Sequence, residues 1–287
     1  MGSLGASSRD LRCYKESARA TNKHETRKEL LLGMVSKGNV AIGRRALLLL
    51  LAVVAALLAA SGVALAANKV CPSGTTQANP CLGTNASDKL TGTSRTDYIN
   101  GRAGNDVELG LLGDDFLWGE EGRDVLVGGT EQFETPNFDT MYGGPDADVN
   151  VWAPGDGDDD FFGGRGRDAQ VFGVIDRNAN NVPTLSGPGR DYPYGLPTAD
   201  VTQSPGFCTL ERAGQQGNFD FLARFFVRET GQLAVTIRLA DVEQVFCTSR
   251  AGGRITYADL TQANPRFVTV SRGEAANLNP TVGRIIR

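Results

Sequence analysis

Histidine is almost absent from this chain, and the single one, His24, lies near the amino terminus. An export signal in the same region is expected to remove it. A mature chain without histidine cannot use a Ser-His-Asp or Cys-His mechanism, and it cannot form a HExxH zinc site. The sequence therefore argues against the commonest hydrolase chemistries and predicts no catalytic residues.

Long apolar runs are also scarce, and the one present lies within residues 46–66. It follows a basic leader, residues 1–45, and ends in small residues at an A-x-A spacing, which is typical of a secretory signal peptide. Its apolar core of about 15 residues is short for a membrane span, which needs about 20. Cleavage after Ala66 or Ala67 is expected, and an uncleaved membrane anchor is the alternative.

The leader is long for a signal peptide. Met34 opens an ordinary basic lead, so residues 1–33 are interpreted as a mis-assigned start or a dispensable segment. A genuine cytoplasmic tail is the alternative. The pair Arg44-Arg45 invites a twin-arginine interpretation, but the flanking residues fit it poorly.

Cysteine is limited to five residues, and removal of the leader would take Cys13 with it. Four cysteines in an exported chain predict two disulfides. The preferred pairing among three is Cys71 with Cys81 and Cys208 with Cys247. A zinc site is not expected, because no CxxC pair or histidine accompanies these cysteines.

The formal net charge of −4 conceals one strongly acidic segment. Residues 83–171 hold 19 Asp/Glu against 6 Lys/Arg, whereas residues 1–45 carry a net +6 and residues 172–287 a net +2. Acidic runs are usually solvated or disordered surfaces, but here the acids recur in phase with glycine. Most of the basic leader would be lost on export, so no nucleic-acid partner is expected.

Aspartate recurs through the acidic segment at close to nine-residue spacing, and the first five members keep that spacing without exception. The nine aspartates are Asp88, Asp97, Asp106, Asp115, Asp124, Asp139, Asp148, Asp159 and Asp168. So regular a period marks a stacked repeat. Stacking would align the carboxylates in rows, which need a cation. Calcium is the obvious candidate, because it accepts several oxygen ligands in a flexible geometry.

The clear repeats share glycine at positions 1 and 4, aspartate at position 6 and usually an apolar residue at position 8. Glycine permits positive φ and lets backbone carbonyls turn toward a shared point. Further candidate ligands are therefore the turn carbonyls near Gly101, Gly104, Gly110, Gly113, Gly119, Gly122, Gly163 and Gly166. Positions 7 to 9 predict short strands whose position 8 points into a thin core. The expected core residues are Leu90, Ile99, Leu117, Leu126, Met141 and Phe161.

In these positions the sequence resembles the haemolysin-type calcium-binding repeat, or repeats-in-toxin (RTX) family, with its G-G-x-G-x-D-x-U-x signature. The resemblance implies an all-β fold over residues 83–171, a parallel β-roll (a right-handed β-solenoid) with two nonapeptides per coil. Several Ca²⁺ ions would lie between turns two repeats apart, held by position-6 carboxylates and turn carbonyls. One edge of the roll would hold Asp88, Asp106, Asp124, Asp148 and Asp168. The other edge would hold Asp97, Asp115, Asp139 and Asp159.

Some repeats depart from this pattern. About six extra residues fall between residues 128 and 142, with residues 132–137 as the expected bulge, and Trp152-Ala153 is a two-residue insert. Asp146 stands where the fourth-position glycine is expected. Three polar residues occupy position 8, namely Glu108, Asn150 and Gln170.

Two other acidic motifs have alternative interpretations. Residues 156–160 faintly resemble an EF-hand loop, but the closing glutamate and flanking amphipathic helices are missing. The pairs Asp114-Asp115 and Glu120-Glu121 could suggest acid/base catalysis. Surface solvation or additional calcium ligation is the preferred interpretation of both pairs.

The period ends at Phe172. Residues 176–206 have the composition of a loop, residues 219–228 and 233–239 predict a β-hairpin, and residues 242–247 and 254–257 predict further strands. The tail after Gly273 is expected to be loosely ordered. As a whole, residues 172–287 are expected to form a β-rich cap on the roll, and residues 67–82 a disulfide-bearing cap at its other end. A separate glycan-binding or wall-binding β domain is the alternative for residues 172–287.

These features predict a bacterial calcium-binding β-roll protein, secreted or at the cell surface, that folds when it meets calcium and has a structural or surface-interaction role. Calcium is the expected cofactor and first partner, a cell-surface glycan or protein is a second candidate partner, and membrane contact is expected only through the signal segment. The alternatives are an adhesin or glycan-binding matrix protein, and a polysaccharide-modifying enzyme that uses paired carboxylates within residues 172–287.

Overall fold

The computed structural model describes residues 64–129, 137–214 and 217–287. His24, Cys13, the leader, nearly all of the apolar run and most of the expected bulge lie outside these residues. Across the described ranges, the structure contains no helix with the length and hydrophobicity that a membrane span requires.

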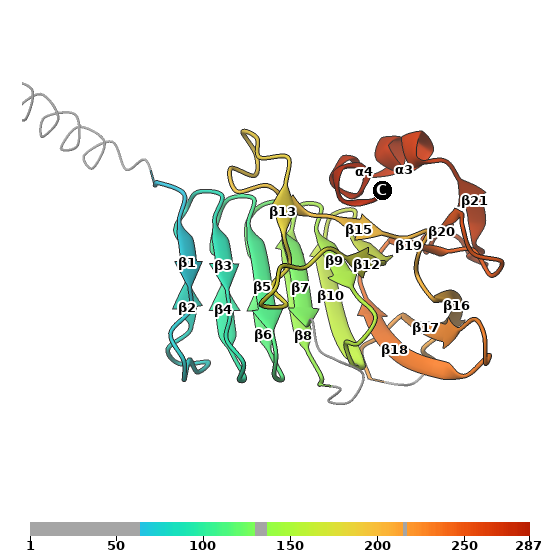
Figure 1. The fold of residues 1–287 in the computed structure, drawn as a ribbon, viewed down its shortest axis with the longest axis horizontal. Helices are drawn as coiled ribbons and strands as arrows, with labels where there is room; N and C mark the ends of the chain where they lie inside the picture. Colours follow the sequence, from blue (N-terminus) through green and yellow to red (C-terminus); the bar gives the residue numbers. More distant parts are fainter. Residues whose placement is uncertain (1–63, 130–136, 215–216) are drawn as a thin grey trace, which may run out of the picture. The chain divides into compact units, whose positions relative to one another are not determined.

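Two parallel sheets form a β-solenoid of about five turns, in which successive short strands alternate between the sheets (Figure 1). The first sheet contains, in spatial order, β1 (Asn68–Val70), β3 (Lys89–Thr91), β5 (Val107–Leu111), β7 (Val125–Gly129), β9 (Val149–Trp152), β11 (Ala169–Phe172), β19 (Gln244–Thr248), β20 (Ile255–Asp259) and β21 (Val268–Val270). The second contains β2 (Cys81–Leu82), β4 (Tyr98–Asn100), β6 (Phe116–Trp118), β8 (Thr140–Pro145), β10 (Asp159–Arg165), β18 (Leu233–Ala240), β17 (Phe221–Val227) and β16 (Gly206–Arg212). The predicted all-β roll is confirmed.

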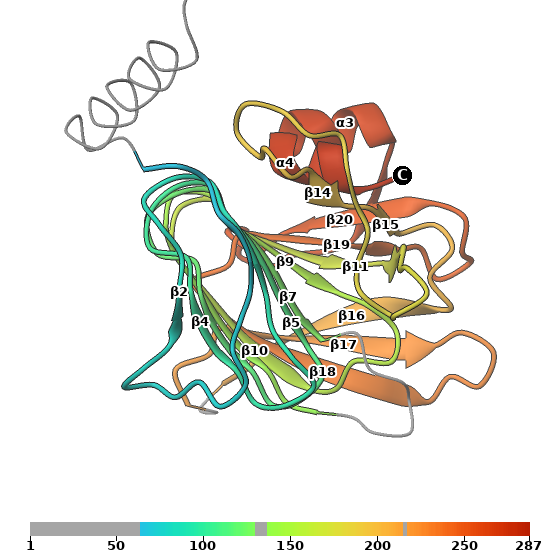
Figure 2. The ribbon, with the colours of Figure 1, turned by 60° about the vertical axis from the view of Figure 1, so that its left-hand side comes forward.

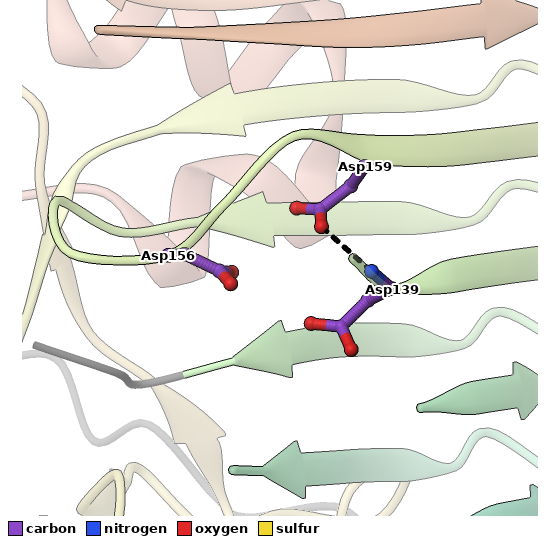
Figure 3. Close-up of side chains that lie close together, drawn as sticks. All are labelled: Asp139, Asp156 and Asp159. Carbon is purple, nitrogen blue, oxygen red and sulfur yellow. Dashed lines mark hydrogen bonds between the residues drawn. The ribbon is translucent and has the colours of Figure 1, made fainter. Parts of the chain in front are cut away.

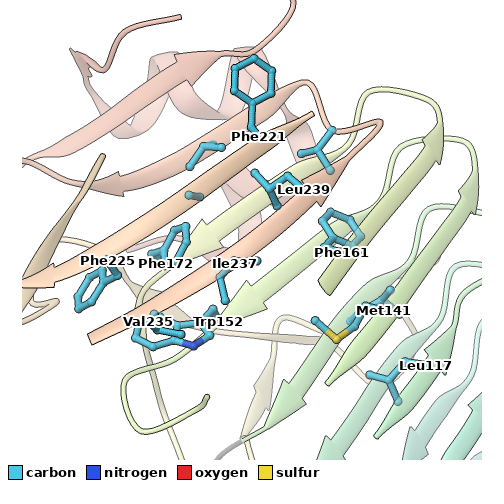
Figure 4. Packing of buried hydrophobic residues seen from close by; sticks show 14 of the residues in the cluster. Leu117, Met141, Trp152, Phe161, Phe172, Phe221, Phe225, Val235, Ile237 and Leu239 are labelled. Atoms are coloured by element: carbon cyan, nitrogen blue, oxygen red, sulfur yellow. The ribbon is translucent and has the colours of Figure 1, made fainter. Parts of the chain in front are cut away.

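Equivalent repeat positions lie side by side across the coils. Ile99 is opposite Leu117, and Leu117 is opposite Met141, so the second sheet presents a continuous apolar column to the interior. All six expected core residues are completely buried. Figure 4 shows Leu117, Met141 and Phe161 continuing into the side chains of β17 and β18. A three-residue strand buries little alone, so this shared core is what stabilises each coil.

Both predicted disulfides are confirmed. Cys71 and Cys81 close a short loop at the first coil, between β1 and β2. Cys208 and Cys247 join β16 in the second sheet to β19 in the first. The second bond therefore ties the two sheets together beyond the last repeat.

The carboxy-terminal third continues the roll. The predicted hairpin is confirmed as β17 and β18, which pair antiparallel. β18 pairs parallel with β10, and β19 pairs parallel with β11, so each sheet of the roll gains its next strand from this segment. The strands beyond them, β16, β17, β20 and β21, pair antiparallel.

The prediction of a loosely ordered tail was wrong. The structure contains α3 (Arg272–Leu278) and α4 (Pro280–Ile285) there. Ser271 and Glu274 form a capping box that starts α3, a local S-x-x-E pattern that the sequence does carry. Asn279 caps α4, with Pro280 at its first position.

The outer faces of the two sheets differ. The first sheet is covered by α3, α4 and the segment that contains β12 (Val174–Ile175), β13 (Leu185–Ser186), β14 (Leu196–Pro197) and β15 (Ala199–Asp200), as Figure 2 shows for the helices. The second sheet carries a series of half-buried rings, here called the aromatic ladder. Its members are Tyr98, Phe116, Trp118, Tyr142, Phe162 and Phe219.

Candidate metal centre

Five aspartates form one row along an edge of the roll, here called the first row: Asp88, Asp106, Asp124, Asp148 and Asp168. The backbone N–H of each of the first four members donates to the Oδ1 of the next member, at 2.6 to 2.8 Å. One carboxylate oxygen of each later member is therefore fixed by the coil before it.

The other four repeat aspartates form the second row, Asp97, Asp115, Asp139 and Asp159. The same amide-to-Oδ1 contact recurs there at 2.7 to 2.9 Å. The Thr75 hydroxyl donates to Asp97 Oδ1 and accepts from the Tyr98 amide, so it stands at the beginning of this row. The structure thus separates the nine aspartates into the two sets that the resemblance to the RTX repeat implies.

The second oxygen of the first-row carboxylates has a different environment. The Oδ2 atoms of Asp106, Asp124, Asp148 and Asp168 are buried, and within the described part of the chain they have no hydrogen-bond partner. Leaving a carboxylate oxygen buried and unpaired is costly, and a bound cation removes that cost.

Glycine carbonyls face these carboxylates. A Cβ added at Gly83 would lie 2.7 Å from Asp88 Oδ2 and 2.4 Å from the Gly101 carbonyl oxygen. A Cβ added at Gly92, Gly110 or Gly143 would meet the same two kinds of atom. One is the Oδ2 of the aspartate in the same repeat, and the other is the carbonyl oxygen of the first-position glycine in the next coil. At these four glycines, the absence of a Cβ therefore lets oxygens from two neighbouring coils approach one another.

The fourth-position glycines are required for close stacking. Gly122 has φ +134°, and a Cβ there would lie 1.6 Å from the Gly104 carbonyl oxygen. Asp146, the aspartate that replaces a fourth-position glycine, adopts φ +79° in spite of its side chain. That departure from the repeat is therefore accommodated by the backbone, at some conformational cost.

Of the predicted carbonyl ligands, those of Gly101, Gly110, Gly119 and Gly163 face row carboxylates in this way. The carbonyl of Gly104 instead lies against Gly122, and that of Gly113 accepts the Asn137 side-chain amide at 2.6 Å. The first-position carbonyls thus face the rows, whereas these two fourth-position carbonyls lie in contacts between coils.

Burial raises the pKa of four first-row carboxyls, those of Asp106, Asp124, Asp148 and Asp168. The pKa of Asp106 and that of Asp148 rise to about 8 and that of Asp168 to about 7, mainly through desolvation, which the accepted amide hydrogen bond only partly offsets. The pKa of Asp124 lies well above its usual range because of burial and the neighbouring Asp148 charge. Without a counter-ion these groups favour the protonated form.

A third aspartate joins two members of the second row. Asp139, Asp156 and Asp159 each place one carboxylate oxygen within 4.8 Å of the others (Figure 3). The Asp156 Oδ2 accepts the Gly129 amide at 3.1 Å. Asp156 lies in the segment that precedes β10, and the nine-residue count did not identify it as a candidate ligand.

Other residues of the first row were also missed. The Asp168 amide donates to Glu243 Oε2 at 2.7 Å, so Glu243 takes the place of the next repeat aspartate. The Asp241 carbonyl lies 2.2 Å from a Cβ added at Gly163, where other coils place a glycine carbonyl. In the second row, the carbonyl of Gly128, which was also missed, lies beside Asp115 Oδ2 at Gly110. Glu243 and Asp241 follow no nine-residue spacing, so no local signal marks them.

The two alternative acidic motifs take ordinary places in the roll. Residues 156–160 lead into strand β10 and have no flanking helix, so the EF-hand interpretation is wrong. Asp114, Glu120 and Glu121 are exposed on turns, apart from the buried row member Asp115.

The donor set consists of carboxylate and carbonyl oxygens, which suit hard cations such as calcium. Stacked coils with two edge rows of aspartate and facing glycine carbonyls define a calcium-binding β-roll. The family model of the RTX calcium-binding nonapeptide repeat, in four copies, matches residues 82–107 and 109–131. The chain therefore carries RTX calcium-binding repeats, as the repeat pattern predicts. A comparison with curated proteins gave no match to this chain.

Proposed function

We propose that this chain is an exported protein whose roll folds around several calcium ions, and that it has a structural or surface-interaction role without catalysis. The ions would be held between coils by the nine row aspartates and by first-position glycine carbonyls. Residues 67–82 and 172–287 would cap the two ends of the roll, and residues 46–66 would direct export.

One observation carries this proposal: Asp106, Asp124, Asp148 and Asp168 each use one carboxylate oxygen for the neighbouring coil and keep a second, buried oxygen that has no hydrogen-bond partner among the described residues. At Asp106 and Asp148, a glycine carbonyl of the next coil lies close to that second oxygen. A cation bound there would contact two coils at once. Calcium would therefore join coil to coil, and its binding free energy would be folding free energy.

The charge of the roll supports a folding role for the ion. Residues 83–171 carry 19 acidic against 6 basic side chains, and the rows bring the aspartates of successive coils together. Without a cation, this repulsion and the burial cost oppose folding. The chain would then stay extended where calcium is scarce and fold where calcium is plentiful.

Calcium titration of the full chain after chelator treatment tests the proposal. We expect a cooperative gain of far-ultraviolet β signal and of thermal stability with calcium, and a much smaller response to magnesium, which demands a tighter octahedral site. A chain that is folded in chelator and indifferent to calcium would contradict it.

The aromatic ladder favours a surface-interaction role as a second candidate. Its rings remain half-buried on the second sheet, while the equivalent face of the first sheet is covered. Binding of the calcium-loaded chain to cell-surface polysaccharide would test this role. The variant Trp118→Ala removes a ring of the ladder, and Trp152→Phe, which alters a ring in the interior of the roll, is the control. Loss of binding in Trp118→Ala alone would support the ladder, and equal binding by both variants would argue against it.

The enzyme alternative would need paired acids in a cleft within residues 172–287. The structure has a cleft of about 290 Å³ lined by Asp220, Asp241 and Glu243. Asp220 accepts the Asp241 amide and Glu243 accepts the Asp168 amide, so two of the three carboxylates hold the backbone in place. These contacts favour a structural role, and a Glu243→Ala variant, which removes the acceptor of the Asp168 amide, would be expected to lose stability.

A further inference from the structure

Glu108 lies inside the roll, where the two adjacent coils have leucine. It belongs to β5, and the register places it between Leu90 of one coil and Leu126 of the next. Its side chain is fully buried, and neither Oε1 nor Oε2 has a hydrogen-bond partner among the described residues. An unpaired carboxylate in an apolar column is expensive, so an apolar core alone does not account for this residue.

The Glu108 carboxylate is directed at the first row. A Cβ added at Gly101 would lie 2.3 Å from Asp106 Oδ2, 2.9 Å from Glu108 Oε1 and 3.0 Å from the Gly119 carbonyl oxygen. Three oxygens from two coils thus converge above one glycine. At Gly83, Gly92 and Gly110 the three closest atoms belong only to the repeat aspartate and a neighbouring glycine.

The charges that act on Glu108 all have the same sign. Besides its own burial, the acidic groups Asp124, Asp106 and Glu120 act on this carboxylate, and the backbone of Gly101 offsets only part of their effect. Two carboxylates that face one another in a buried space require either a shared proton or a cation. A cation would also satisfy the unpaired Oδ2 of Asp106.

We propose that Glu108 is an additional carboxylate ligand, reaching from the interior of the roll to the cation site between the coils of Asp106 and Asp124. This inference rests on the proposed function, because it assumes that the first row binds cations. With three carboxylates rather than two, this site would bind calcium more tightly than its neighbours. It would also show the strongest preference for trivalent lanthanides, since affinity follows the ligand charge.

Calorimetric titration of the full chain with calcium, and then with terbium, tests the assignment. Glu108→Gln keeps the side-chain shape and removes the charge. Glu121→Gln removes the same charge from an exposed turn and serves as the matched control. We expect Glu108→Gln to weaken the tightest calcium site by about tenfold or more, and terbium binding by a larger factor, with no change in Glu121→Gln.

The outcomes separate the two proposals. If the wild-type chain binds calcium and Glu108→Gln binds it with the same tightest affinity, Glu108 is not a ligand, although the roll still binds calcium. If the wild-type chain binds no calcium, the proposed function fails and this inference fails with it. If Glu108→Gln folds poorly, Glu108→Leu provides a second test, because it places leucine between Leu90 and Leu126. Glu108→Leu should melt at a higher temperature than the wild type in chelator, and calcium should raise its melting temperature by less. If calcium raises the melting temperatures of both proteins equally, the assignment is overturned.

Discussion

The backbone amide of Asp106 donates to Oδ1 of Asp124 at 2.7 Å, across 18 residues of sequence. The equivalent bond from Asp124 to Asp148 spans 24 residues, and that from Asp148 to Asp168 spans 20. The contact is therefore kept although the length of the coil changes. It holds one carboxylate oxygen in place and leaves the second one for a ligand.

The effect of Asp124→Asn on the melting temperature should have opposite signs in chelator and in calcium. An asparagine side-chain oxygen can still accept the Asp106 amide, while the buried charge and its repulsion with Asp148 are removed. In chelator the variant should melt at or above the wild-type temperature, and in saturating calcium it should melt below it. Differential scanning calorimetry in both buffers measures this crossing.

Asp191→Asn is the control for that experiment. Asp191 is exposed and forms a surface ion pair with Arg123, which contributes about 1 kcal/mol at most. It should melt like the wild type in both buffers. Equal behaviour of Asp124→Asn and this control would argue against a ligand role for the first row.

Calcium should change how the stability of the roll depends on pH. Burial raises the pKa of Asp106 and Asp148 to about 8 in the folded state, whereas an unfolded aspartate titrates near pH 4. The chelated native roll therefore binds more protons than the unfolded chain between these values, so its stability falls as pH rises from about 4 to about 8. Calcium binds the charged form, so calcium affinity should rise over the same range.

Melting temperatures across this range, in chelator and in calcium, test the pH dependence. The gap between the two curves should widen as pH rises. Parallel curves would show that calcium and protons do not compete for the same groups.

Gly122→Ala should destabilise the roll strongly. Its Cβ would overlap the Gly104 carbonyl of the previous coil, and φ +134° is strained for alanine. We expect a loss of about 3 kcal/mol or more in the free energy of unfolding. Gly273→Ala, in open space on helix α3, should be neutral or stabilising by up to about 1 kcal/mol. Denaturant unfolding in calcium compares the two, and similar midpoints would contradict the close stacking at Gly122.

Loss of the Cys208–Cys247 bond should cost more than loss of Cys71–Cys81. The two bonds close loops of 39 and 10 residues. Loop entropy then gives about 4 and about 3 kcal/mol, respectively. Paired serine variants in calcium, unfolded with denaturant, measure the difference. A larger effect from Cys71 and Cys81 would show that native contacts, rather than loop closure, decide the order.

The part of the fold that the sequence could predict is the part with an unbroken period. From Asp88 to Asp124 a nine-residue count fixes the strand, the turn and the row of each residue. The family match ends at residue 131, close to the first insert, although the coils continue to Asp168. An insert changes the number of residues in a coil but not the contact between coils. The nine-residue period is therefore lost at the insert, although the coils of the roll continue beyond it.

Other parts depend on contacts that no local pattern encodes. Glu243 completes the first row from 75 residues away. The cover on the first sheet comes from a segment with loop composition, where Ile175, Tyr192 and Leu196 are buried against the sheet. Here tertiary packing, rather than propensity or period, selects the conformation. Asp156 joins the second row for the same reason, because folding brings its carboxylate close to that of Asp139 on another coil.

The pairing of β18 with β10 has a consequence for the speed of folding. Arg238 on β18 forms an ion pair with Asp160 on β10, and the two residues are 78 positions apart. Coils of 18 residues can close on one another by short searches, but this last junction requires the closure of a far longer segment. Refolding should therefore show a late step set by the arrival of β18 and β19. Stopped-flow refolding in calcium measures this step, and a single phase as fast as the closure of one coil would contradict it.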